Sequence, residues 1–259
     1  MKLIKSKTVL FVTGAFVSNT GWDTWIEYFK EKGFTAVAPA WPHKDAPALE
    51  LRKRHPDSAL AGLHLRELVD HYIRIIKALP EKPIIIGHSL GGLVTQILIS
   101  RGYGVAGVAY HSAPPQGILS FEYSFLKSMW GPLDLFGSTK VPYMMPFKHW
   151  QYTFTNTMPL KDQQDAYERM IIPESKTTLR DCLGKDAKID LDKAHEPLLF
   201  VSGSADHIMP ASLNYKNFKK YKHAGSITEY KDFPGRNHFA MGQPTWKEDA
   251  DFILNWISK

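Results

Sequence analysis

The sequence contains a single cysteine, Cys182, and no spacing of cysteines and histidines typical of a structural zinc site. A disulfide scaffold needs at least two cysteines, so that class of fold is excluded. No run of about 18 apolar residues without charges occurs, which excludes a transmembrane helix. We therefore expect a globular protein with no metal and no membrane partner.

The excess of positive charge is small. The 32 basic and 26 acidic residues give a net charge of +6, and 44% of the 259 residues are apolar, a composition that excludes a disordered chain. The basic residues are scattered, and their one cluster, Arg52-Lys53-Arg54, is predicted to lie in a loop. We therefore expect a basic, solvated surface and no nucleic-acid partner.

The N-terminus imitates a signal peptide, because Lys2, Lys5 and Lys7 precede the apolar run Thr8–Val12. The run is short, and no convincing small-x-small cleavage site follows it. The same segment also fits a core strand. We expect an intracellular, cytoplasmic protein.

Strands and helices alternate along the chain. The predicted strands are Thr8–Val12, Phe34–Ala38, Pro83–Ile86, Val105–Ala109, Pro197–Val201 and, more weakly, Ser226–Tyr230. The predicted helices are Trp22–Lys32, Ser58–Leu79, a segment that ends at Arg101, Ser212–Tyr221 and Thr245–Ser258. This alternation predicts an α/β fold with a mostly parallel six-stranded sheet and helices on both of its faces.

One long segment interrupts the alternation between the fourth and fifth strands. Within Phe121–Phe154, ten of 34 residues are aromatic, against 12% in the whole chain. We predict that residues 1–115 and 197–259 form the core and that residues 116–196 form an α-helical cap over the carboxyl edge of the sheet, where open α/β sheets bind ligands. Most of its aromatic residues are expected to pack internally, but Phe125, Trp130 and Trp150 are candidates for lining a pocket.

The strongest local signal is Gly87-His88-Ser89-Leu90-Gly91-Gly92, which follows an isoleucine strand and opens a helix. A bare Gly-x-Ser-x-Gly match is weak, but this context is that of a nucleophile elbow. Gly87 and Gly91 lack the Cβ atoms that would collide in such a turn, and Gly92 permits close packing of the helix. Ser89 is therefore the predicted nucleophile, in a strained backbone conformation.

A serine nucleophile needs a base and a group that orients the base. Asp206 follows the fifth predicted strand and His238 follows the sixth, so all three side chains are expected at one sheet edge in the order Ser, Asp, His. Two alternatives remain open: Asp206 caps the following helix, or His238 is an ordinary loop histidine.

Three other histidines compete for the role of base. His88 is expected to point away from the turn, His207 adjoins the acid, and His111 ends the fourth strand. We include His88 and His111, together with Phe16 and Phe239, among the residues predicted to line the substrate pocket.

An oxyanion hole is the remaining requirement. One donor is predicted to be the backbone N–H of Leu90, and the second an N–H of the loop after the first strand. In that loop Ala15 is the first candidate and Phe16 the second.

These residues together resemble the α/β-hydrolase superfamily. The resemblance is carried by Thr13–Phe16 with Gly21-Trp22, by Gly87–Gly92, by Asp206 and by Gly235–Phe239, and it covers nearly the whole chain. Within the superfamily, the chain is similar to the compact group of plant methylesterases and hydroxynitrile lyases, and to bacterial small-molecule esterases.

The sequence also departs from these relatives at specific positions. Many members carry His where Thr13 stands, and the lyases carry Lys where Phe239 follows the catalytic histidine. Ser89 at the elbow excludes the dehalogenase type, which uses Asp there.

The resemblance implies a serine hydrolase that cleaves a carboxylic ester or lactone of a small, partly apolar substrate through an acyl-enzyme, without a cofactor. The alternatives are a C–C lyase of the hydroxynitrile type and a slow-turnover ligand-binding sensor. A perhydrolase side activity and the choice between monomer and homodimer are left open.

Overall fold

The computed structural model describes residues 4–258, so Lys2 of the signal-like segment lies outside the described residues. Its centre is a six-stranded parallel sheet in the order β2-β1-β3-β4-β5-β6. The strands are β1 Thr8–Val12, β2 Thr35–Val37, β3 Ile84–His88, β4 Ala106–Tyr110, β5 Leu198–Gly203 and β6 Thr228–Phe233. Each predicted strand overlaps an observed one, and the predicted fold class is confirmed.

Helices cover both faces of the sheet. They are α1 Asp23–Glu31, α2 Ala48–Lys53, α3 Ser58–Ala61, α4 Leu65–Ala78, α5 Leu90–Ser100, α6 Tyr123–Leu133, α7 Phe147–Thr153, α8 Leu160–Met170, α9 Lys176–Asp181, α10 Ala211–Phe218 and α11 Trp246–Ile257, with short 3₁₀ turns at Asn19–Trp22, Lys185–Ala187 and Ala240–Gly242. In residues 4–258, no helix combines the length and the apolarity needed to cross a bilayer.

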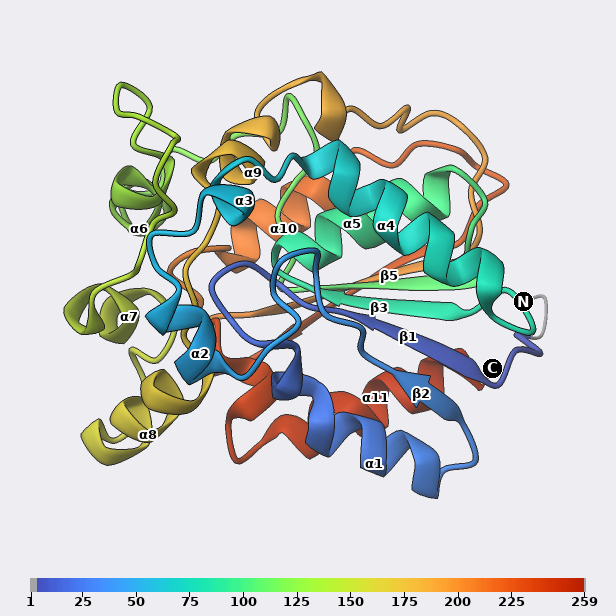
Figure 1. The fold of residues 1–259 in the computed structure, drawn as a ribbon. Helices are drawn as coiled ribbons and strands as arrows, with labels where there is room; N and C mark the ends of the chain where they lie inside the picture. The colour runs from blue at the N-terminus through green and yellow to red at the C-terminus, as the bar shows by residue number, and fades with distance from the viewer. Residues whose placement is uncertain (1–3, 259) are drawn as a thin grey trace.

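Successive strand residues supply two separate layers of core. Val9 and Phe11 of β1 pack with α1 and α11, whereas Leu10 and Val12 pack with α4 and α5 on the other face. Figure 1 shows α1 and α11 on one side of the sheet and α4, α5 and α10 on the other. All five β1 residues are buried, as expected for a parallel strand covered on both faces.

The predicted helix Ser58–Leu79 is observed as two helices, which corrects the prediction. Gly62 ends α3, and His64 begins α4 with a new cap, in which the His64 backbone N–H donates to Glu67 Oε2 over 3.0 Å. The apolar periodicity is similar on both sides of the break, so periodicity alone did not reveal it.

The predicted loop at Arg52-Lys53-Arg54 is also wrong, because Arg52 and Lys53 form the last turn of α2. Basic side chains are favourable at the carboxyl end of a helix. Arg52 also donates to the Ile171 carbonyl over 2.9 Å, which ties this turn to the insertion.

The insertion between β4 and β5 contains α6, α7, α8 and α9. Figure 1 shows α6, α7 and α8 beyond one end of the sheet, away from the N-terminus. Two isolated antiparallel bridges, Val17–Ile171 and Tyr143–Glu174, join the loop after β1 to the insertion and the insertion to itself. The division into a core and a cap stays a prediction.

Candidate active site

Ser89 lies in the tight turn between β3 and α5, with φ 57° and ψ −120°. A Cβ on Gly87 would lie 2.0 Å from the Gly91 carbonyl oxygen, and one on Gly91 would lie 2.1 Å from that of Val12. Larger residues at these two positions would therefore push the turn apart, as predicted. A Cβ on Gly92 would lie 2.5 Å from Ser112 Oγ, so the close packing expected there is present too.

The structure brings the three predicted catalytic side chains together. The Ser89 hydroxyl lies 2.9 Å from His238 Nε2, and His238 Nδ1 lies 2.7 Å from Asp206 Oδ2. All three side chains are buried. The carboxylate accepts from Nδ1, which leaves Nε2 as the acceptor for the hydroxyl proton.

Asp206 holds its position through both carboxylate oxygens. Oδ1 accepts the backbone N–H groups of Ile208 and Met209 over 2.9 and 2.7 Å, while Oδ2 accepts from His238. The next helix, α10, begins at Ala211, so Asp206 caps the intervening turn rather than that helix. Burial by itself raises the pKa of Asp206, but the attraction of His238 and the histidine hydrogen bonds outweigh it and hold the pKa well below its usual range.

His111 is a second histidine on the same carboxylate, a role that the sequence did not reveal. Its Nδ1 donates to Asp206 Oδ2 over 2.7 Å, and its side chain is fully buried at the end of β4. His111 therefore lies behind the acid and is not among the residues that line the cavity at Ser89.

His88 and His207 are also bound elsewhere. His88 Nε2 donates to the His238 carbonyl oxygen over 2.8 Å, and His207 Nδ1 donates to the Tyr152 carbonyl oxygen over 2.8 Å. Burial, followed by the neighbouring His238 and His111, lowers the pKa of His88 well below its ordinary value. His88 is bound to the His238 backbone and is not among the residues that line the cavity at Ser89.

Burial also lowers the pKa of His238 below its ordinary value, although Asp206 opposes this effect. The imidazole is therefore neutral at neutral pH, which is the state that can accept a proton from Ser89.

A cavity of about 50 Å³ opens at Ser89. Its lining includes Phe16, a predicted pocket residue, and Ala15 and Leu90, the two residues predicted to donate to an oxyanion. The other lining residues are Ala113, Met129, Leu179, Cys182, Ile208 and Met209. Of these six, only Ile208 and Met209 had a sequence signal, because they lie two and three residues after Asp206. The other four come from three separate segments, since Leu179 and Cys182 both belong to α9 and its C-terminal end.

The loop after β1 approaches the nucleophile closely. A Cβ on Gly14 would lie 2.8 Å from Ser89 Cβ, and Phe16 has a left-handed backbone with φ 68°. The Phe16 N–H donates to Glu174 Oε2 over 3.0 Å, so this second candidate donor is already engaged. Among the described residues, the N–H groups of Ala15 and Leu90 donate to no protein acceptor.

Glu174 is a buried carboxylate that sequence analysis missed. Its Oε2 lies 2.5 Å from Lys44 Nζ, and its Oε1 accepts the Ser175 N–H over 2.9 Å. Lys44 is itself buried and lies over the Trp41 ring at 3.9 Å, and burial lowers its pKa although Glu174 opposes the shift. The pair joins the insertion to the segment between β2 and α2, and 130 residues separate its members in the chain. Through the Phe16 N–H, Glu174 also holds the loop after β1.

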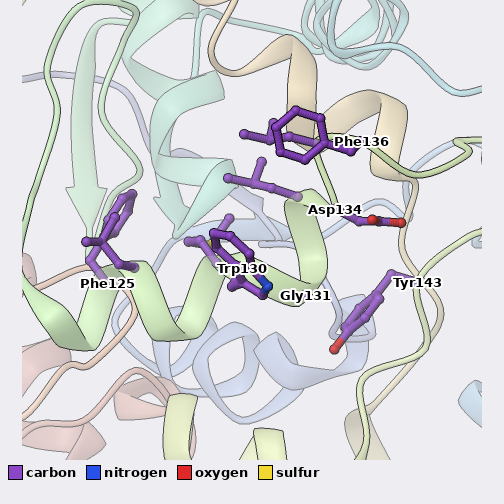
Figure 2. A pocket seen from close by; sticks show the side chains of 10 residues that line it. Phe125, Trp130, Gly131, Asp134, Phe136 and Tyr143 are labelled. Atoms are coloured by element: carbon purple, nitrogen blue, oxygen red, sulfur yellow. The ribbon is translucent and has the colours of Figure 1, made fainter.

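The predicted pocket aromatics fall into three places. Phe16 lines the cavity at Ser89, whereas Phe125 and Trp130 line a separate, larger cavity on α6 (Figure 2). Trp150 and Phe239 line neither of these two cavities. They pack on each other with ring centroids 5.6 Å apart, and Trp150 is fully buried, so their part in binding a substrate stays a prediction.

His111, Asp206 and His238 place potential metal-ligand atoms within 4.8 Å of one another. Both histidine Nδ1 atoms lie 2.7 Å from the carboxylate, a hydrogen-bond distance, and His238 Nε2 lies next to Ser89. These contacts direct the donor atoms toward one another and toward the hydroxyl, which fits proton transfer better than metal binding.

A family model described as the alpha/beta hydrolase family matches residues 9–248. The chain belongs to the alpha/beta hydrolase family. A search of the curated proteins finds no matching sequence.

Solved structures of this alpha/beta hydrolase fold are similar to the chain over nearly its whole length. A methylesterase from Arabidopsis is 14% identical with a TM-score of 0.66, covering 97% of this chain and 98% of its own. A monoacylglycerol lipase from Paleococcus ferrophilus is 20% identical with a TM-score of 0.67, covering 97% and 93%. An extracellular alpha/beta-hydrolase from a Paenibacillus species is 18% identical with a TM-score of 0.69, covering 96% and 98%. At these identities the likeness establishes the fold.

Proposed function

We propose that this alpha/beta hydrolase cleaves a carboxylic ester or lactone of a small, partly apolar substrate through a covalent acyl-enzyme. The observation that carries the proposal is the chain of two hydrogen bonds from Ser89 to His238 to Asp206, which ends at an apolar cavity. Esterases and a lipase among the structures of similar fold agree with this reaction class.

In the first half of the reaction, His238 Nε2 takes the Ser89 hydroxyl proton while Oγ attacks the ester carbonyl carbon. The carbonyl oxygen becomes an oxyanion, for which the Leu90 and Ala15 N–H groups are the proposed donors. The tetrahedral intermediate collapses, the C–O bond to the alcohol breaks, and His238 returns the proton to the leaving alcohol.

In the second half, water replaces the alcohol. His238 takes a proton from the water, the resulting hydroxide attacks the acyl carbon, and Ser89 leaves with the proton restored to Oγ. Asp206 orients the imidazole and stabilises the imidazolium in both halves. One ester and one water give one acid and one alcohol, and no step requires a cofactor or a metal.

The decisive experiment compares Ser89→Ala and Asp206→Asn with the unmodified protein on a panel of aryl esters, alkyl esters and lactones. We expect kcat to fall at least about 10⁴-fold for Ser89→Ala and about 10³- to 10⁴-fold for Asp206→Asn, with circular dichroism unchanged. Ser100→Ala, at the other end of α5, is the matched control and is expected to retain full activity.

Three results would contradict the proposal. They are ester turnover that survives in Ser89→Ala, release of cyanide from mandelonitrile in place of ester cleavage, and labelling of Ser89 by a fluorophosphonate without multiple turnovers on any member of the panel. The second result would favour a lyase and the third a ligand-binding sensor. The cytoplasmic location and the monomeric or homodimeric state stay predictions.

A further inference from the structure

A cavity of about 470 Å³ lies on the insertion, next to α6. Its walls come from α6 and from the segment that follows it, and Figure 2 shows Phe125, Trp130, Phe136 and Tyr143 around it. Its volume falls within the range of about 300–1,000 Å³ typical of small-molecule sites. The cavity at Ser89, at about 50 Å³, is roughly a tenth as large.

The walls of this outer cavity carry large apolar side chains that face solvent. Trp130 is 79% exposed and Phe136 is 98% exposed. Of the 12 exposed large apolar side chains found in residues 4–258, eight lie between Leu119 and Val141. A concentration of apolar surface of this kind marks a binding site more often than chance exposure does.

The carboxylate and the hydroxyl in the walls are already paired, which favours an uncharged, apolar occupant. The Asp134 carboxylate accepts from Lys176 Nζ over 2.8 Å, and the Tyr143 hydroxyl lies 3.0 Å from His149 Nδ1. A charged or strongly polar ligand would find few free partners here.

The outer cavity adjoins the cavity at Ser89. Met129 lines both cavities, and the rings of Phe16 and Tyr143, one from each lining, contact each other with centroids 6.0 Å apart. A methionine side chain is flexible and can move aside more easily than a branched or aromatic one. Met129 is therefore an adaptable side chain that the walls of both cavities share.

We propose that the outer cavity is a second subsite of the proposed hydrolase, which holds an unbranched or weakly branched apolar chain of the ester, and that Met129 is the gate between the two subsites. The inference rests on the proposed function. The cavity at Ser89 has room for a short group only. A substrate of moderate size therefore extends past Met129 into the outer cavity, where apolar side chains contact it. The substrate class is then an ester that carries a medium-length hydrocarbon chain.

The test is a chain-length series measured in two arms. In p-nitrophenyl alkanoates the acyl chain is lengthened from two to fourteen carbons, and in alkyl acetates the alcohol is lengthened over the same range. We expect kcat/KM to rise about three- to fourfold per added methylene in one arm until the cavity is filled, since each buried methylene contributes about that factor. The arm that rises identifies which side of the ester occupies the cavity.

Variants of residues that line the outer cavity test whether the rise in kcat/KM with chain length comes from this cavity. The double variant Trp130→Ala/Phe136→Ala truncates two exposed side chains, so it is expected to fold normally and to lower the ratio of kcat/KM for the ten-carbon over the two-carbon substrate at least tenfold. Met129→Ala is expected to raise that ratio. Leu160→Ala, an exposed leucine on α8 outside the lining, is the matched control and is expected to leave the ratio unchanged.

A flat profile in both arms, or a rise that the double variant leaves intact, would overturn the subsite. Loss of binding to phosphatidylcholine vesicles in the double variant with an unchanged ratio would also overturn it, in favour of a lipid-surface contact. Calorimetric binding of decyl acetate to Ser89→Ala separates the two proposals. If no ester is hydrolysed but this binding is present and the wall truncations weaken it, the subsite stands and the proposed function fails.

Discussion

Two regions of the molecule differ in how firmly their side chains are held. At the sheet edge, Ser89, His238 and Asp206 are buried and linked by hydrogen bonds. In the insertion, α6 and its flanking segment expose apolar side chains to solvent. At the sheet edge, Asp206 accepts four hydrogen bonds and His238 is held between two partners. In the insertion, Trp130 and Phe136 line a cavity, and most of each side chain is exposed to solvent.

The difference follows from the two tasks of the proposed site. Proton transfer needs donor and acceptor atoms within about 3 Å of each other, so the groups that carry it are fixed by packing and paired charges. Contact with a hydrocarbon chain is non-directional and roughly proportional to the area buried, so an adaptable apolar wall is sufficient. In the proposed hydrolase, the sheet edge supplies the geometry for proton transfer and the insertion supplies the apolar contact surface.

The largest effect is expected where the insertion is anchored to the core. Glu174→Ala leaves buried Lys44 without its counter-charge and Phe16 N–H without its acceptor, so we expect the free energy of unfolding to fall by about 5 kcal/mol, the upper end for breaking a buried ion pair. Urea denaturation measures it. Asp165→Ala breaks the exposed Lys161–Asp165 pair and is expected to leave stability almost unchanged.

A small loss in Glu174→Ala, comparable to that of the control, would contradict the view that the Lys44–Glu174 pair anchors the insertion to the core. The double variant Lys44→Met/Glu174→Leu removes both charges, and it is expected to regain part of the lost stability because no unpaired buried charge remains.

Two tryptophans of the insertion allow a matched test of its buried and exposed parts. Trp150 is fully buried and stacks on Phe154 with centroids 4.5 Å apart, and Phe154 in turn contacts the His238 ring at 4.8 Å. Trp150→Ala is expected to cost about 3–5 kcal/mol of unfolding free energy and to lower kcat. Trp130→Ala is expected to change stability by no more than about 0.5 kcal/mol, because its side chain is exposed.

Thermal or urea unfolding of the two variants, measured side by side, compares their losses of unfolding free energy. Equal losses would show that α6 is packed as firmly as the rest of the insertion, and the contrast drawn between the two regions would then be wrong.

The smallest effect is expected in the pH profile. Burial lowers the pKa of His238 below its ordinary value of 6.5, so the imidazole stays neutral at a lower pH than a free histidine does. Falling pH protonates this base and stops it from accepting the Ser89 proton, so the acid limb of kcat/KM is expected to have its midpoint below pH 6.5 on an uncharged ester. A midpoint above pH 7 would show that the site is more solvated than its burial indicates, and circular dichroism at each pH checks that the chain remains folded.

Sequence reasoning succeeded where the deciding interactions are local. The turn at Ser89 was predictable because Gly87 and Gly91 have steric reasons to be glycine within a few residues. The nearness of Asp206 and His238 to Ser89 was predictable because residues that follow parallel strands share one sheet edge. The break between α3 and α4 was missed because apolar spacing continues across it, although Gly62 is the residue that ends the first helix.

Other residues of the candidate site carried no local pattern. Lys44 and Glu174 meet across 130 residues of chain, and Met129 is one of several methionines in the insertion until packing places it between two cavities. His111 was visible as a residue at a strand end, but its bond to Asp206 depends on how β4 and β5 lie together.

The sequence by itself determined the order of strands and helices, the sharp turn at Ser89 and the residue types available for chemistry. It could do so because periodicity, capping and steric exclusion act between near neighbours. The tertiary structure decided which buried charges pair, which aromatic rings are covered, and how the cavity volume near Ser89 is divided. These outcomes depend on contacts between segments far apart in the chain, and those contacts form only when the whole core is packed.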